Sequence, residues 1–235
     1  MTGGHRLDDL WLNETVTTHE TERPGAQGWV PPGAGLEQLR AAAAGCAGCE
    51  LHVPATQTVF SSGSPTARLA FVGEQPGDAE DRQGAPFVGP AGRLLDEALQ
   101  RAGIDRQDTY VTNAVKHFRF TPTPQRRLHQ TPDLAHISAC RPWLAAELAV
   151  VDPEVVVCLG ATAARALLGP DFRVTRQRGM LFPRRARSDH PALVRAGWMM
   201  GTVHPSSVLR ADDRDAALTA LVTDLQVAAA ALVPA

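Results

Sequence analysis

Lysine is almost absent from this chain of 235 residues, since Lys116 is the only lysine among its 23 Lys and Arg side chains. Arginine use this heavy can come from codon bias, so basic content alone identifies no partner. Residues 1–81 carry more acidic than basic side chains, and the reverse holds for residues 82–210. This asymmetry is compatible with binding to a phosphate backbone, but a solvated surface explains it equally well.

Long hydrophobic runs are also missing, and none approaches the roughly 20 apolar residues of a membrane span. The first residues, MTGGHRLDDLWLNETVTTHE, lack the basic-then-apolar order of a signal peptide. We therefore expect a cytoplasmic protein with no membrane segment. Residues 1–34 mix Thr, Glu, Gly and Pro without hydrophobic periodicity, which predicts a mobile leader before a folded domain over residues 35–235.

Within that domain, short apolar runs alternate with helical patterns. Strands are predicted at 68–73, 109–115, 154–160 and 198–203. Helices are predicted at 92–103, 142–151, 161–168 and near 212–232, with Pro142 opening the second of them. This alternation predicts an α/β fold, a three-layer sandwich around a central four-stranded, mostly parallel sheet.

Polar residues follow three of these strands, at the edge where ligands of such sheets bind. Glu74 and Gln75 lie in GEQPGD, Asn113 ends the second strand, and His204 begins HPSS. Neither G-x-G-x-x-G nor a P-loop lysine is present, which disfavours a nucleotide cofactor. An amide and a carboxylate suit a polar planar ligand on which Phe87 could stack. Taken singly, Phe87 is more often a core residue, Asn113 a strand cap and His204 a satisfied turn histidine.

Two further features carry potential chemistry. The stretch TPTPQRRLHQTP (121–132) predicts an irregular loop that holds Arg126, Arg127 and His129, and a solvated basic loop is its simplest interpretation.

The four cysteines, Cys46, Cys49, Cys140 and Cys158, form C-x2-C and a distant C-x17-C. In a reducing compartment they favour a metal over disulfides, and the split second pair favours a 4Fe–4S cluster over zinc. Alternatively, Cys158 is a small core residue inside VVVCLG.

Together, GEQPGD, PFVGPAG, YVTNAV, the Arg-Arg-Leu-His loop, HPSS and the cysteines resemble the iron–sulfur uracil-DNA glycosylases of family four, and most closely their UdgX branch. The resemblance covers roughly residues 35–225. The UdgX loop pattern is Lys-Arg-Arg-Ile-His, and Gln125 stands here in place of its lysine.

The resemblance implies the uracil-DNA glycosylase fold and a monomer that excises uracil, mainly from single-stranded DNA, after the nucleotide is flipped out. It implies that Phe87 stacks on the base, Asn113 recognises its edge, His204 donates to a carbonyl oxygen and Gln75 lines the pocket. His129 would then capture C1′ as Glu74 takes the ring proton, which leaves a covalent cross-link. The remaining implied contacts to DNA are Asp78, Arg126, Arg127 and Ser206, with the four cysteines holding a 4Fe–4S cluster.

Two alternatives stay open. One is a turnover glycosylase of family four, in which water captures the sugar. The other is a non-catalytic iron–sulfur module that binds nucleic acid.

Overall fold

Four parallel strands form the centre of the sheet in the computed structural model, which describes residues 23–184 and 197–232. They are β2 (Leu69–Gly73), β3 (Thr109–Asn113), β6 (Val155–Leu159) and β8 (Gly197–Thr202), and they match the four predicted strands. Two antiparallel edge strands, β1 (Ser61–Gly63) and β7 (Leu181–Arg184), complete the order β1-β3-β2-β6-β8-β7. The predicted fold class is confirmed, with six strands in the sheet rather than four.

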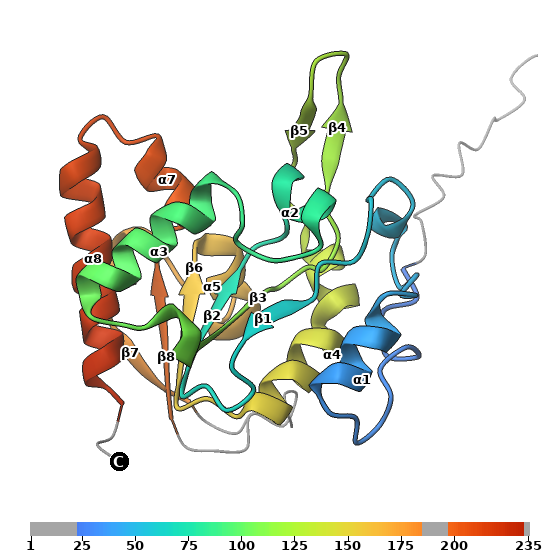
Figure 1. Ribbon diagram of the computed structural model, residues 1–235, viewed down its shortest axis with the longest axis horizontal. Coiled ribbons are helices and arrows are strands. Elements are labelled where there is room, and N and C mark those ends of the chain that lie inside the picture. Colours follow the sequence, from blue (N-terminus) through green and yellow to red (C-terminus); the bar gives the residue numbers. More distant parts are fainter. Residues whose placement is uncertain (1–22, 185–196, 233–235) are drawn as a thin grey trace, which may run out of the picture.

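Alternate residues of the central strands face opposite layers of helices. Leu69 and Phe71 pack into the core beneath α3 (Pro90–Ala102) and α8 (Arg214–Ala230), while Ala70 and Val72 pack beneath α4 (Leu134–Val151) and α5 (Ala161–Leu168). Buried on both faces, β2 and β6 are apolar throughout, as parallel strands usually are, whereas β3 also contains two threonines and an asparagine. Figure 1 shows the two helical layers on either side of the sheet, with α1 (Leu36–Ala43) beside α4.

The shorter elements lie at the sheet ends and in connections. These are α2 (Asp78–Gln83), α6 (Val174–Gln177), α7 (Pro205–Leu209) and the 3₁₀ turns η1 (Glu50–His52) and η2 (Arg106–Asp108). Both α2 and α7 follow the carboxyl ends of strands, β2 and β8 respectively, and both lie at the upper edge of the sheet in Figure 1. No helix within residues 23–184 and 197–232 has the length and apolarity needed to cross a bilayer.

The expected leader divides into two parts. Residues 1–22 lie outside the described part of the chain, but residues 23–34 pack on the domain. The Ala26 amide donates to the Ala139 carbonyl at 2.8 Å, and Ala26 itself is buried. The packed region therefore begins before Gly35, the expected boundary.

The expected irregular loop is instead a β-hairpin. Strands β4 (Phe120–Pro122) and β5 (Arg127–His129) pair antiparallel, with Phe120 opposite His129 and Pro122 opposite Arg127. Figure 1 shows this hairpin standing clear of the sheet, above α2. Its position brings His129 to the same sheet edge as the residues that follow β2, β3 and β8.

Candidate functional site

Asn113 ends β3 with an unsatisfied polar atom. Its side chain is 1% exposed, and Oδ1 is buried without a hydrogen-bond partner among the described residues. Gly73, its neighbour in β2, has no side chain, and a Cβ there would lie 2.3 Å from Asn113 Oδ1 and 2.6 Å from Phe87 Cζ. A buried acceptor left unpaired is costly. The arrangement is therefore suited to a ligand that donates a hydrogen bond to Asn113.

Phe87 is held beside Asn113 in a strained conformation. Its φ of 57° is in the left-handed region, which a bulky residue rarely adopts. Gly92, in the first turn of α3, permits this conformation because a Cβ there would lie 1.7 Å from the Phe87 carbonyl oxygen. Strain of this kind is concentrated at functional sites. It places a buried aromatic ring next to the unpaired amide oxygen.

His204 faces the same space from the N-terminus of α7. Its ring centroid lies 6.0 Å from that of Phe87. Burial lowers the pKa of His204 to about 4, with a smaller contribution from His129, so the ring is neutral near pH 7. Its Nδ1 accepts from the Ser206 amide at 3.1 Å, which leaves the proton of the neutral ring on Nε2. Ser206 was expected to contact substrate, but in the structure its amide orients the His204 ring, whose Nε2–H is the donor.

His129 is the more exposed histidine of the site, and it lies against a carboxylate. Its side chain is 49% exposed, and Nε2 is 3.5 Å from Glu74 Oε1. Glu74 is fixed in turn by the hydroxyl of Thr162, which donates to Oε2. No sequence pattern marks Thr162 as a site residue, although it lies in the first turn of α5, which follows the carboxyl end of β6.

Gln75 contacts the hairpin on both of its arms. Its Oε1 accepts from the Arg119 amide at 3.0 Å, while Nε2 contacts the carbonyl oxygens of Arg119 and Gln130 at 3.1 and 3.0 Å. Nε2 also lies 2.9 Å from His129 Nε2. The expected pocket-wall residue is therefore engaged in holding the base of the hairpin and the imidazole that the hairpin carries.

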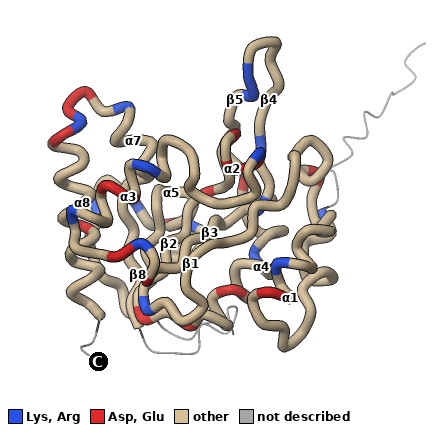
Figure 2. Tube along the Cα trace, in the orientation of Figure 1, with Lys and Arg blue, Asp and Glu red and all other residues tan. Residues whose placement is uncertain are grey.

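The two hairpin arginines differ sharply. Arg127 pairs with Asp78 and, at 2.6 Å, with Asp81, and its guanidinium lies over the Phe118 and Phe120 rings. Figure 2 shows basic positions on the hairpin above acidic positions around α2. Both Arg127 and Asp78, which were expected to contact DNA, thus anchor the hairpin to α2. Burial alone would raise the pKa of Asp78, but ion pairs with Arg82 and Arg127 lower it.

Arg126, by contrast, is exposed, and its guanidinium makes no polar contact within the described part of the chain. It is the hairpin cation that remains available to an external anion.

The cysteines are not all brought together. Cys46, Cys49 and Cys140 share one buried cluster with Trp143. Two N–H groups point at their sulfurs, since Trp143 Nε1 donates to Cys46 at 3.2 Å and the Lys116 amide donates to Cys140 at 3.3 Å. Burial raises the pKa of Cys140 to about 12, and the neighbouring Cys49 and Cys46 add to the rise.

Cys158 lies elsewhere, fully buried within β6 and packed in the core cluster beneath α4 and α5. Its register partners are Val72 in β2 and Gly201 in β8, and burial alone raises its pKa to about 12. The interpretation of Cys158 as a core residue fits the structure, and its expected place among four metal ligands does not. No group of three or more His, Cys, Asp or Glu side chains within the described ranges is close enough to bind a single metal ion.

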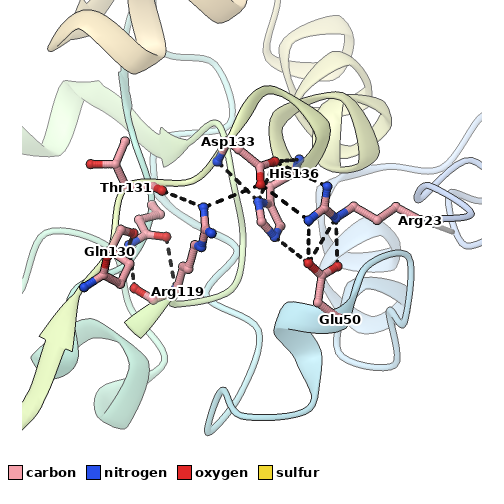
Figure 3. Close-up of polar contacts among 8 residues, drawn as sticks. Arg23, Glu50, Arg119, Gln130, Thr131, Asp133 and His136 are labelled. Carbon is pink, nitrogen blue, oxygen red and sulfur yellow. Dashed lines mark hydrogen bonds and ion pairs between the residues drawn. The ribbon is translucent and has the colours of Figure 1, made fainter. Parts of the chain in front are cut away.

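A polar chain connects the cysteine segment with the hairpin (Figure 3). Glu50, next to Cys49, accepts from Arg23 at 2.6 Å and contacts His136 at 2.8 Å. The ion pair with Arg23 lowers the pKa of Glu50 to about 2. Asp133 caps α4 by accepting from the His136 amide, and it also lies 3.6 Å from Arg119 at the hairpin base. One continuous set of contacts therefore reaches from Arg23 to Arg119, at the base of the hairpin that carries His129.

A family model and several relatives of known name point to the same protein family. The model of the uracil DNA glycosylase superfamily matches residues 60–226. The Type-4 uracil-DNA glycosylase of Thermotoga maritima is 37% identical over 174 residues, which cover 70% of this chain and 78% of that protein. The Type-4 enzyme of Archaeoglobus fulgidus is 40% identical over 120 residues, 51% of this chain and 57% of the relative. Apart from Cys46 and Cys49, the expected site residues lie within residues 60–226.

Proposed function

Because the chain belongs to the uracil-DNA glycosylase superfamily, we propose that it excises uracil from DNA, preferentially single-stranded, and that His129 then joins it covalently to the abasic site. The proposed cross-link rests on the contact of His129 Nε2 with Glu74 Oε1, which are 3.5 Å apart. Glu74 directly follows Gly73, the register partner of Asn113. An imidazole beside a carboxylate is the usual arrangement of an activated nucleophile.

Excision needs a pocket that stabilises uracil as it leaves with the electrons of its bond to C1′. Asn113 Oδ1 accepts from the N–H of the base edge, which supplies the missing partner of a buried oxygen. His204 donates from Nε2 to a carbonyl oxygen on which negative charge develops. It does so as a neutral ring near pH 7. Phe87 stacks on the flipped base.

Capture follows at the hairpin. The C1′–N1 bond breaks, and a lone pair of the His129 ring forms a new N–C1′ bond with the cationic sugar. The proton on the other ring nitrogen passes to Glu74. The product is a neutral N-substituted imidazole whose departure would require an imidazolate, so the adduct persists. Arg126 is free to contact a phosphate as the strand approaches.

A turnover glycosylase is the second candidate. It is favoured by the Type-4 names of the relatives and by Gln125 in place of the UdgX lysine. In this alternative water, rather than His129, captures the sugar, and the protein is released after each excision.

Denaturing gel electrophoresis distinguishes the two candidates. We expect the parent protein to convert a uracil oligonucleotide into a slowly migrating adduct, faster with single-stranded than with duplex DNA. Alkali-labile sites without an adduct would instead establish the turnover enzyme, and intact DNA would refute both. His129→Ser should abolish the adduct and retain uracil release, because water fits where the imidazole stood. Glu74→Gln should slow adduct formation more than uracil release.

Three cysteines, Cys46, Cys49 and Cys140, could supply three of the four ligands of a 4Fe–4S group. N–H donors already face the sulfurs of Cys46 and Cys140, and hydrogen bonds to sulfur are typical of such sites. The cluster would link the N-terminal segment to the sheet, which is a structural role. We assign Cys46, Cys49 and Cys140 as ligands, and His117 as the fourth.

His117 follows Lys116, whose amide contacts Cys140. Its Nε2 lies 2.9 Å from the Thr58 hydroxyl, which donates its only proton to the Ala43 carbonyl. The Nε2 atom must therefore carry the ring proton, which leaves Nδ1 unprotonated as a ligand. Cys158→Ala should keep the iron content and visible absorbance of the parent, whereas His117→Ala should lower both and His117→Cys should restore them. Iron loss in Cys158→Ala alone would overturn this assignment.

A further inference from the structure

The single lysine of the chain is buried behind Asn113. Lys116 is 1% exposed, and its Nζ donates to Thr112 Oγ1 at 2.6 Å, to the Asn113 carbonyl at 2.9 Å and to Glu147. Nothing in the excision or capture steps uses this ammonium. Lys116 lies three residues after Asn113 in the chain, and it binds the main chain of Asn113 rather than a position open to substrate.

The contacts explain why a lysine stands here in a chain that otherwise uses arginine. A compact ammonium directs three N–H bonds at three separated acceptors, whereas a guanidinium presents its donors in one planar fork. Two of the acceptors, Thr112 Oγ1 and the Asn113 carbonyl, belong to β3, and the third, the Glu147 carboxylate, belongs to α4.

Glu147 completes the buried network from α4. It is fully buried and accepts from Tyr110 Oη at 2.8 Å and from Thr112 Oγ1 at 3.0 Å. A buried ion pair is costly to desolvate unless its remaining hydrogen-bonding groups are satisfied. Here both partners are satisfied, so the pair is a fixed support for the turn that follows β3.

That turn is held from two sides. On one side, the amides of Ala114 and Val115 donate to the carbonyls of Gly73 and Glu74 at 2.9 and 3.0 Å. On the other side, Lys116 Nζ binds the Asn113 carbonyl. The main chain of Asn113 is thereby fixed, while its side-chain Oδ1 lies near the Phe87 ring without a hydrogen-bond partner among the described residues.

We infer that Lys116, supported by Glu147, is a positioning residue that aims Asn113 at the leaving base. This inference rests on the proposed function, since it assigns Asn113 to uracil recognition. A positioned hydrogen bond acts on the transition state, so its loss should lower the excision rate and leave DNA affinity unchanged.

The test uses Lys116→Met combined with Glu147→Gln, which leaves no buried charge unpaired. We expect the single-turnover rate of uracil release to fall by about 10- to 30-fold, with unchanged affinity for uracil-free DNA. In an Asn113→Ala background the same pair should cause less than a twofold further loss, because its effect acts through Asn113. Leu148→Val, which trims the core at the next residue of α4, should leave the rate within twofold of the parent.

An unchanged rate in the Lys116 and Glu147 variant, or an equal loss with and without Asn113, would refute the positioning role while the proposed function stands. A parent protein that releases no uracil would refute the proposed function and this inference together. If the methionine variant does not fold, Lys116→Gln with Glu147→Gln repeats the test under the same expectations, because the amide keeps a polar group at the site.

Discussion

The base pocket and the hairpin are built differently, although they meet at one sheet edge. Asn113 is buried at the end of β3, and the buried Phe87 lies beside it. His204 is held by the Ser206 amide in the first turn of α7. His129 is half exposed on a three-residue strand and depends on Gln75 and on the Arg127 contacts with α2. The pocket is therefore part of the rigid core, whereas the hairpin is an attached element. This difference suggests that bond cleavage and sugar capture can be separated by mutation.

The largest effect should come from Asn113→Ala, which changes the base pocket and leaves the hairpin intact. It removes the acceptor whose partner is the leaving base, and a lost transition-state hydrogen bond of this kind costs on the order of 10²- to 10³-fold in rate. Because capture follows cleavage, adduct formation should fall by the same factor. Single-turnover measurements of released uracil and of adduct would check this. Adduct that forms at the parent rate would mean that Asn113 does not act on the base.

A smaller effect, restricted to capture, is expected for Arg127→Met. This change removes the ion pairs with Asp78 and Asp81 but keeps an apolar side chain against Phe118 and Phe120. A looser hairpin should slow adduct formation about tenfold, and uracil release should change less than threefold. A parallel loss in both measurements would show that the hairpin belongs to the pocket.

Arg126→Met is the matched control in the same hairpin. As an exposed side chain that is available to a phosphate, Arg126 should contribute to DNA affinity and its salt dependence. Its loss should lower the slope of log affinity against log salt by about one, with the ratio of adduct to released uracil unchanged.

The same contrast explains what the sequence could predict. Of the four central strands, β2 and β6 were the easiest to recognise, because burial on both faces makes them continuously apolar. Strands β1 and β7 are only three and four residues long and pair on one side, so no pattern marks them. Asn113, Glu74 and His204 could be placed at one edge because the carboxyl ends of parallel strands must meet there.

Features that depend on tertiary contacts were missed or misassigned. Pro142 predicted a helix start but lies inside α4, which begins after Asp133. There His136 supplies the reciprocal capping contact in place of the usual Glu or Gln. Spacing suggested Cys158 as a ligand because spacing does not reveal which face of a strand a side chain occupies. The role of Arg127 in anchoring the hairpin was hidden because its partners lie 46 and 49 residues away.

The smallest expected effect is a loss of stability at acid pH, which comes from the buried His204 of the base pocket. The pKa of His204 falls from 6.5 to about 4 on folding, chiefly through burial, so the unfolded chain binds more protons between these values. The stability that the neutral ring retains above pH 6.5 is therefore lost progressively as the pH falls towards 4. A shift of this size corresponds to at most about 3 kcal/mol. His204→Gln cannot gain this charge, so its melting temperature should fall less than that of the parent between pH 7 and pH 4.5. Equal acid sensitivity of the two proteins would mean that His204 is not held neutral by the pocket.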